Sequence, residues 1–172
     1  MNTTTRPRAA RRAIGAIGAA LASALMMIPC TTAIAAETSV PIDAAHFPDE
    51  AFRRVVQFRY DMNNNGTLSQ QELTAVTRII VGERGIKSAK GIEYFTALTD
   101  LDLSNNQLSS VDLSHNTALR GLELGNNQLS SVDLSHNTVL RGLGLGNNQL
   151  SSLDVSHNTK LDWLYLADNQ LS

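Results

Sequence analysis

One stretch of the chain carries oxygen-bearing side chains at short, regular intervals. It reads Asp61-Met62-Asn63-Asn64-Asn65-Gly66-Thr67-Leu68-Ser69-Gln70-Gln71-Glu72, which satisfies the calcium-loop pattern D-x-[DN]-x-[DN]-G-x5-E. At this spacing oxygens from separate positions converge on one cation, because the glycine allows a sharp bend between them. The sequence therefore predicts a Ca²⁺ site whose ligands are Asp61, Asn63, Asn65, the Thr67 backbone carbonyl and Glu72.

The charge of this loop indicates weak binding. Only Asp61 and Glu72 are carboxylates, so they just neutralise a divalent cation, and no second loop is visible to pair with this one. We expect a structural ion with a Kd on the order of 10⁻⁵ to 10⁻³ M. The alternative is a loop that stays empty and is kept only for its helix–turn–helix shape.

Two helices are expected to position this loop. The first spans residues 49–60, with Phe52, Val55 and Val56 on one face and Pro48 at its start. Ser69 is expected to cap the second helix, with Glu72 three residues later as in a capping box.

A repeat dominates the second half of the chain. Leu98, Leu119, Leu140 and Leu161 are each 21 residues apart, and the unit reads L-x-x-L-x-L-x-x-N-Q-L followed by S-S-[VL]-D-[LV]-S-H-N-T. The two leucines of L-x-L lie on one side of a strand. An inward asparagine then bonds the backbone of the turn through both its carbonyl and its amide, and Asn116 and Asn137 are expected to do the same in the second half of the unit.

These residues resemble the leucine-rich repeats of secreted Gram-positive bacterial proteins. Residues 42–72 resemble the EF-hand-like cap that often precedes such repeats, including the wording F-P-D-x-x-F-R at 47–53. The resemblance implies an α+β fold, in which a short helical EF-hand-like cap is followed by a leucine-rich repeat solenoid with short parallel strands on its concave face. We predict a cap at 36–75, a degenerate first coil at 76–97, repeats at 98–118, 119–139 and 140–160, and a partial repeat at 161–172.

The outward strand positions are the best candidates for a binding surface. They change from acidic (Asp100, Asp102) to glycine-rich and end in Trp163 and Tyr165. Glycines would allow a ligand to approach the backbone, and the aromatic rings offer large contact area. We therefore predict a shallow peptide or glycan site, unless the two rings merely pack against a further coil. Its contacts are expected from Glu123, Gly144, Trp163 and Tyr165.

Other recurring polar residues are better explained as turn residues than as active sites. His115, His136 and His157 share the 21-residue step, and an aspartate and a serine accompany each of them. A zinc site along the histidines is conceivable. A catalytic triad, however, is a single asymmetric arrangement, whereas this set occurs in each unit. We predict no enzymatic activity.

The N-terminus reads as a signal peptide. Residues 1–35 contain four arginines and no acidic residue, then an apolar run, and they end in Ala33-Ile34-Ala35. A retained membrane helix and a lipoprotein acylated at Cys30 are the weaker alternatives. Cleavage would remove the only cysteine and leave 10 basic and 16 acidic residues, a net charge of −6. This charge balance excludes a nucleic-acid partner. Because the apolar run is removed with residues 1–35, we expect no transmembrane anchor in the mature chain.

Together these features predict a secreted or cell-surface, non-catalytic protein that binds a protein, peptide or glycan in adhesion or recognition. Because the sequence stops at Ser172, partway through a unit, we expect a fragment or a truncated product. The alternative is a structural spacer, or the N-terminal part of a larger surface protein or enzyme.

Overall fold

The computed structural model describes residues 39–172. The predicted signal peptide, residues 1–35, and Cys30 lie outside the described residues. Within residues 39–172, no helix is long and apolar enough to cross a membrane.

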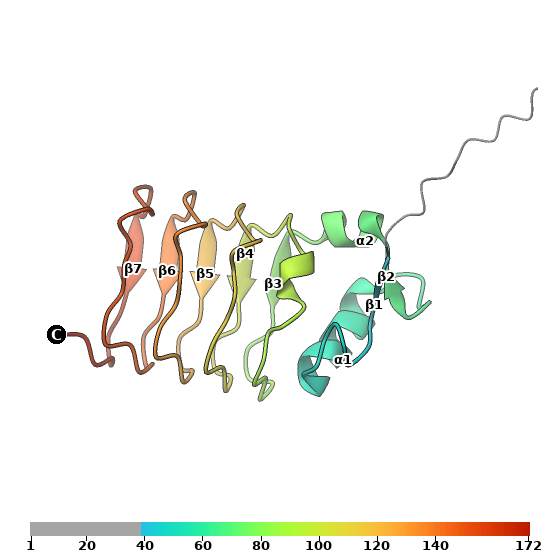
Figure 1. Ribbon diagram of the computed structural model, residues 1–172, viewed down its shortest axis with the longest axis horizontal. Helices are drawn as coiled ribbons and strands as arrows, with labels where there is room; N and C mark the ends of the chain where they lie inside the picture. The colour runs from blue at the N-terminus through green and yellow to red at the C-terminus, as the bar shows by residue number, and fades with distance from the viewer. Residues whose placement is uncertain (1–38) are drawn as a thin grey trace, which may run out of the picture. The chain divides into compact units, whose positions relative to one another are not determined.

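Two short helices form the N-terminal part of the described chain (Figure 1). α1 (Glu50–Tyr60) begins after Asp49, whose side chain caps it by accepting the Phe52 N–H at 2.9 Å. Pro48 therefore precedes the cap residue instead of starting the helix. α2 (Gln70–Ala75) begins after Ser69, and Ser69 and Glu72 form the predicted capping box.

A small two-stranded pairing closes the segment between the helices. β1 (Val40–Pro41) runs antiparallel to β2 (Thr67–Leu68), with Val40 opposite Leu68. Leu68 is fully buried. The apolar position of the 61–72 loop is thus held by the chain's own N-terminal strand.

The rest of the described chain is a parallel β-solenoid. Its five-stranded sheet has the order β3-β4-β5-β6-β7, and all neighbouring pairs are parallel. The strands are β3 (Arg78–Ile80), β4 (Asp100–Asp102), β5 (Gly121–Glu123), β6 (Gly142–Gly144) and β7 (Trp163–Tyr165). Ile79 pairs with Leu101, and Leu101 with Leu122. Paired residues are therefore 22 positions apart between β3 and β4 and 21 positions apart between β4 and β5.

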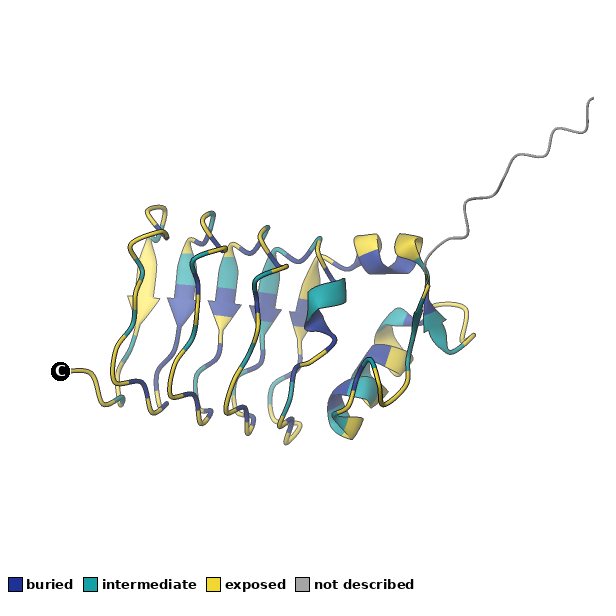
Figure 2. Ribbon diagram, in the orientation of Figure 1, coloured by how far each residue is buried: buried dark blue, intermediate teal, exposed yellow. Residues whose placement is uncertain are grey.

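One aliphatic column runs through the coils. Ile79, Leu101, Leu122 and Leu143 occupy equivalent positions in successive strands, and each is at most 2% exposed. Figure 2 shows this buried column along β3 to β6 and exposed residues in β7. A single coil could not bury its leucines, so the stack is stabilised mainly by contacts between neighbouring coils.

Two columns of equivalent asparagines, here called asparagine ladders, bond the backbone of the turns in different ways. The first ladder consists of Asn106, Asn127, Asn148 and Asn169, and the second of Asn116, Asn137 and Asn158. The Asn127 amide donates to the Leu103 and Leu124 carbonyls, both at 2.9 Å, and its Oδ1 accepts from Leu108 N–H at 3.0 Å. Asn137 also donates twice. However, its buried Oδ1 has no hydrogen-bond partner among the described residues. The expectation that both ladders use carbonyl and amide alike is therefore wrong for the second ladder, which serves only as a donor.

Aromatic packing joins the helices to the first coil. Phe47 lies 6.1 Å from Phe52 and 6.4 Å from Phe95, measured between ring centroids. A short 3-10 helix, η1 (Ile92–Tyr94), follows Gly91. Gly91 has φ 104° and lies against the Phe47 ring, so that a Cβ there would overlap the ring. The helices and the coils therefore share one hydrophobic core.

Candidate functional site

The register of the sheet places the outward side chains in two rows. One row contains Arg78, Asp100, Gly121, Gly142 and Trp163, and the other contains Ile80, Asp102, Glu123, Gly144 and Tyr165. The isoleucine or leucine between each pair points to the core side of the sheet, because side chains alternate along a strand. We call this outward surface the strand face.

Trp163 and Tyr165 form a flat aromatic pair at one end of the strand face. Their ring centroids are 6.3 Å apart and the ring planes differ by 10°. The two side chains are 49% and 47% exposed. Tyr165 lies over Gly146, where a Cβ would overlap the ring, and Trp163 lies beside Gly142. The pair therefore rests on the glycines of the preceding coil.

The glycine-rich middle of the strand face is partly covered. The Glu123 carboxylate lies over Gly144 and occupies the space that a Cβ at position 144 would need. Gly144 and Gly146 are both buried. A ligand at this point therefore meets the Glu123 carboxylate and the Tyr165 ring before it meets the backbone.

Glu123 is the acidic residue of the strand face whose proton affinity is raised. Burial first, and then the negative charge of Asp102, raise the pKa of Glu123 above its usual value. Arg78 Nε lies 4.0 Å from Asp100 Oδ2 and neutralises only that end of the surface. A cationic or hydrogen-bond-donating ligand group beside Glu123 would relieve this unfavourable charge.

The 61–72 loop gathers the oxygens that the sequence singled out. The Asp61 carboxylate accepts N–H bonds from Asn65 at 3.1 Å and Gly66 at 2.9 Å. The Asn63 and Asn65 side-chain carbonyls each accept the N–H of the residue two positions on. Asn64 and Gly66 adopt positive φ values of 55° and 78°, which makes this tight turn possible.

Glu72 closes the loop from the other side. Its Oε1 accepts the Met62 N–H at 2.9 Å, and its Oε2 accepts the Ser69 N–H and Oγ–H, both at 2.8 Å. Burial raises the pKa of Glu72, but the hydrogen bonds from Ser69 and Met62 outweigh burial, and the net effect is a lowered pKa. Glu72 is therefore held as a carboxylate at neutral pH.

The donor set of this loop fits a hard, weakly bound cation. Within residues 39–172, no group of three His, Cys, Asp or Glu side chains could hold a metal ion. A cation at the loop would therefore depend on amide and backbone oxygens as well as on its two carboxylates. The Asp61 and Asn63 side-chain oxygens each accept one N–H bond and keep a second lone pair. Asn65 Oδ1 and Glu72 Oε2 each accept two hydrogen bonds, and a cation would compete with these.

The repeated Asp, Ser and His residues form local turn contacts. Asp112 Oδ1 accepts the Ser114 N–H at 3.0 Å, and Ser114 Oγ lies 3.1 Å from His115 Nδ1. The same contacts recur around Ser135 and Ser156. In each copy the aspartate bonds the serine backbone, as a turn requires and as a catalytic triad does not.

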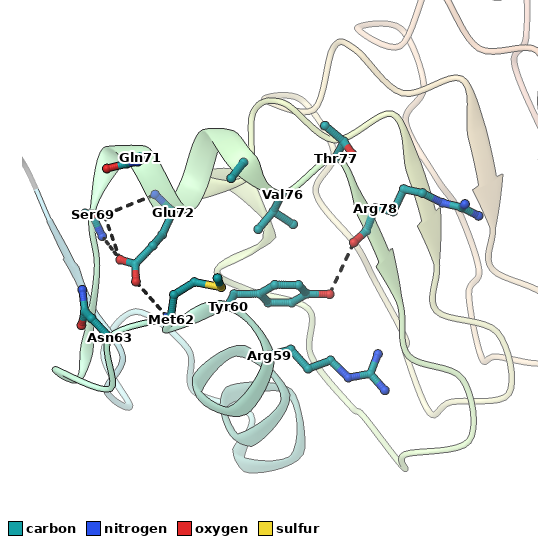
Figure 3. A pocket seen from close by; sticks show the side chains of 11 residues that line it. Arg59, Tyr60, Met62, Asn63, Ser69, Gln71, Glu72, Val76, Thr77 and Arg78 are labelled. Carbon is teal, nitrogen blue, oxygen red and sulfur yellow. Dashed lines mark hydrogen bonds between the residues drawn. The ribbon is translucent and has the colours of Figure 1, made fainter.

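Sequence reasoning missed a cleft at the junction of helices and sheet, shown in Figure 3. The cleft has a volume of about 680 Å³ and includes Tyr60, Met62, Glu72, Val76 and Arg78 in its lining. The Tyr60 hydroxyl donates to the Arg78 carbonyl at 3.4 Å. Because these residues come from α1, the loop, α2 and β3, no single motif indicates the cleft.

Known proteins share the repeat region and its fold. Residues 96–136 match the family model described as Leucine Rich repeats (2 copies). Over 70 residues, or 41% of the chain, the sequence is 34% identical to internalin J of Listeria monocytogenes serotype 4b (strain F2365). That stretch covers 8% of internalin J.

Solved structures extend the similarity to most of the chain. The functional domain of internalin J from Listeria monocytogenes superposes with a TM-score of 0.72 at 33% identity, over 77% of this chain and 29% of that one. An internalin (InlF) from the same species gives a TM-score of 0.64 at 25% identity, over 80% of this chain and 48% of that one. The chain thus spans less than half the length of these relatives. The internalin J domain includes a cysteine ladder, whereas the repeats of this chain contain no cysteine and stack asparagines.

Proposed function

We propose that this chain, a leucine-rich repeat protein related to the Listeria internalins, is an exported, non-catalytic recognition module that binds a protein, peptide or glycan through its strand face. The observation that carries the proposal is the aromatic pair of Trp163 and Tyr165, half-exposed and nearly parallel on the same surface as the Glu123 carboxylate. Flat aromatic surface beside a partly desolvated carboxylate is typical of binding hot spots.

The regular solenoid supports this proposal because it holds the contact residues rigidly. Tyr165 and Glu123 lean on glycines of β6 and the following turn, so their positions are set by the stack. Little side-chain freedom is lost when a ligand binds such a surface, which favours affinity. The strand face also presents several coils at once, and a polymeric ligand could contact all of them.

Binding assays with two strand-face variants test this proposal. The chain is recovered from the medium of an expressing Gram-positive host, where we expect it to begin after residue 35. It is then titrated with host and cell-wall proteins and glycans. Trp163 is the only tryptophan, so its fluorescence reports directly on the strand face of every chain except Trp163→Ala, whose affinity is measured by calorimetry. We expect Trp163→Ala and Glu123→Gln to weaken binding about tenfold or more.

His157→Ala is the matched control, because His157 is exposed in the last complete repeat and belongs to neither row of the strand face. Its affinity should equal that of the unchanged chain. Absence of binding across the panel would contradict recognition and favour the spacer. Recovery only from the cell interior would contradict export.

We also propose that the 61–72 loop binds Ca²⁺ weakly, as an EF-hand-like structural site held by Asp61, Asn63, Asn65, the Thr67 carbonyl and Glu72. Two observations support it: the side-chain oxygens follow the calcium-loop spacing, and Glu72 is kept ionised by its hydrogen bonds. The ion would neutralise two carboxylates that are both nearly buried and so stabilise the junction between α1 and α2.

A further inference from the structure

One side of α1 carries an apolar stripe that the hydrophobic core covers only in part: Ala51 and Val55 are half-buried against the core, whereas Phe58 is exposed. Phe52 and Val56 point into the core, whereas Ala51, Val55 and Phe58 follow one another at helical spacing on a different side. Phe58 is 90% exposed, more than any other large apolar side chain of the described residues. A partner that covered Phe58 would remove this apolar surface from water, which is favourable.

This stripe borders a hollow between α1 and the turn that follows β3. The hollow has a volume of about 390 Å³ and is lined by Ala51, Arg54, Val55, Phe58, Arg59 and Arg84. Three of these six residues are arginines and none is acidic. The hollow therefore has an apolar floor surrounded by guanidinium groups.

Two of the three arginine side chains have a partner within the chain, and all three keep free donors. Arg59 donates to the Ile80 carbonyl at 3.0 Å, and Arg54 pairs with Glu50 one turn earlier on the helix. The Arg84 backbone is held by Asn106 Oδ1 at 3.1 Å, while its side chain is exposed. A guanidinium has five N–H donors, so each of the three can still bind a carboxylate.

We propose that this hollow binds an acidic, amphipathic segment of a partner polypeptide. An apolar side chain of the segment would lie on Phe58 and Val55, and its carboxylates would pair with the surrounding arginines. This site is separate from the strand face and does not depend on the function proposed for that surface.

The lining favours a peptide over other anionic ligands. It contains no amide, hydroxyl or carboxylate side chain, and therefore nothing besides guanidinium to recognise the hydroxyl groups of a sugar. A lipid bilayer is flat and could contact Phe58 but would not fill the concave surface that two arginines of α1 and Arg84 line. The seven-residue span of the stripe corresponds to about 10 Å, which suits successive apolar side chains of a helical segment.

Fluorescence anisotropy with a labelled helical peptide of glutamate and leucine at helical spacing tests the proposal on the full chain. We expect saturable binding, and much weaker binding of the same peptide with glutamine in place of glutamate. Phe58→Ser should weaken binding about fivefold, and Phe58→Ser with Arg84→Gln about twentyfold or more. Both side chains are exposed, so the thermal midpoint should not change.

Arg120→Gln removes the same charge from an exposed position in the repeats and should leave the affinity unchanged. Equal binding of the glutamine peptide would overturn the proposal, as would unchanged affinity in the double variant or no binding of the acidic peptide. Cosedimentation of the chain with phosphatidylglycerol vesicles, lost in the double variant and not competed by the peptide, would overturn it in favour of a membrane.

Discussion

At the scale of single residues, the two asparagine ladders are chemically unequal although the sequence repeats them equally. Asn127 uses its amide and its carbonyl, whereas Asn137 uses only its amide and keeps a buried, unpaired Oδ1. The period of the sequence predicted which asparagines lie inside. It could not predict the difference, because the difference depends on where the backbone N–H groups of the next coil point.

This inequality predicts different costs for the same substitution. Asn127→Ala would leave the buried Leu108 N–H without its acceptor, at a cost of about 1–3 kcal/mol. The Leu103 and Leu124 carbonyls would each lose one donor but keep another, from Asn106 and Asn148 respectively. Asn137→Ala leaves no N–H without an acceptor: the Leu113 and Asn116 carbonyls keep backbone donors, and the substitution removes the unpaired Oδ1. We expect Asn127→Ala to lower the free energy of unfolding by about 1–2 kcal/mol more than Asn137→Ala does.

Urea unfolding followed by circular dichroism measures both values. Gln128→Ala, an exposed change in the same turn, should stay within about 0.5 kcal/mol of the unchanged chain. Equal losses in the two asparagine variants would show that the unpaired Oδ1 is satisfied in solution.

At the scale of elements, the leucine period and the capping residues predicted the strands of the solenoid and the starts of the helices. Pairings between segments that are distant in the sequence were not predicted. The strands of the solenoid follow the leucine period, and both helix starts follow their capping residues. β1 has only two residues, Val40 and Pro41, and no alternation that indicates a strand. It forms because Val40 and Pro41 pair with Thr67 and Leu68 and help to bury Leu68. This contact joins segments that are distant in the sequence, so no local pattern indicates it. The cleft beside Tyr60 was missed for the same reason.

Calcium binding at the loop between α1 and α2 predicts a stability effect. With a Kd of about 10⁻⁵ to 10⁻³ M, calcium at ten times the Kd should stabilise the folded chain by about 1.4 kcal/mol. Isothermal titration calorimetry and thermal unfolding with and without calcium measure the two quantities. Glu72→Gln should abolish the calcium response, because it removes one of only two carboxylates.

Glu72→Gln also weakens the α2 capping box, so a second variant separates the two effects. Leu73→Ala removes a buried side chain of the same helix and should lower the thermal midpoint while the calcium response persists. No heat of binding at millimolar calcium, together with an unchanged midpoint, would show that the loop is a turn without an ion.

At the scale of the whole molecule, burial changes along the stack although the sequence scarcely does. Leucines occupy the same strand position in β4, β5, β6 and β7, and they are 2%, 0%, 0% and 42% exposed, respectively. Among the described residues, β4, β5 and β6 each have two neighbouring strands, whereas β3 and β7 have one each. The helical segment packs against the first coil, so the coil of β7 has the fewest neighbours. A repeat protein of this kind should be most easily opened where a coil has the fewest neighbours.

A series of identical substitutions tests this gradient. Leu122→Ala and Leu143→Ala each remove a fully buried side chain and should lower the free energy of unfolding by about 2–5 kcal/mol. Leu164→Ala, at the same position in β7, should cost about 1 kcal/mol or less, because much of its surface is already in water. Urea unfolding gives the three values, and hydrogen exchange should be fastest in β7. Since the backbone position and the chemical change are the same in all three variants, equal losses would mean that stability is set within each coil and not by its neighbours.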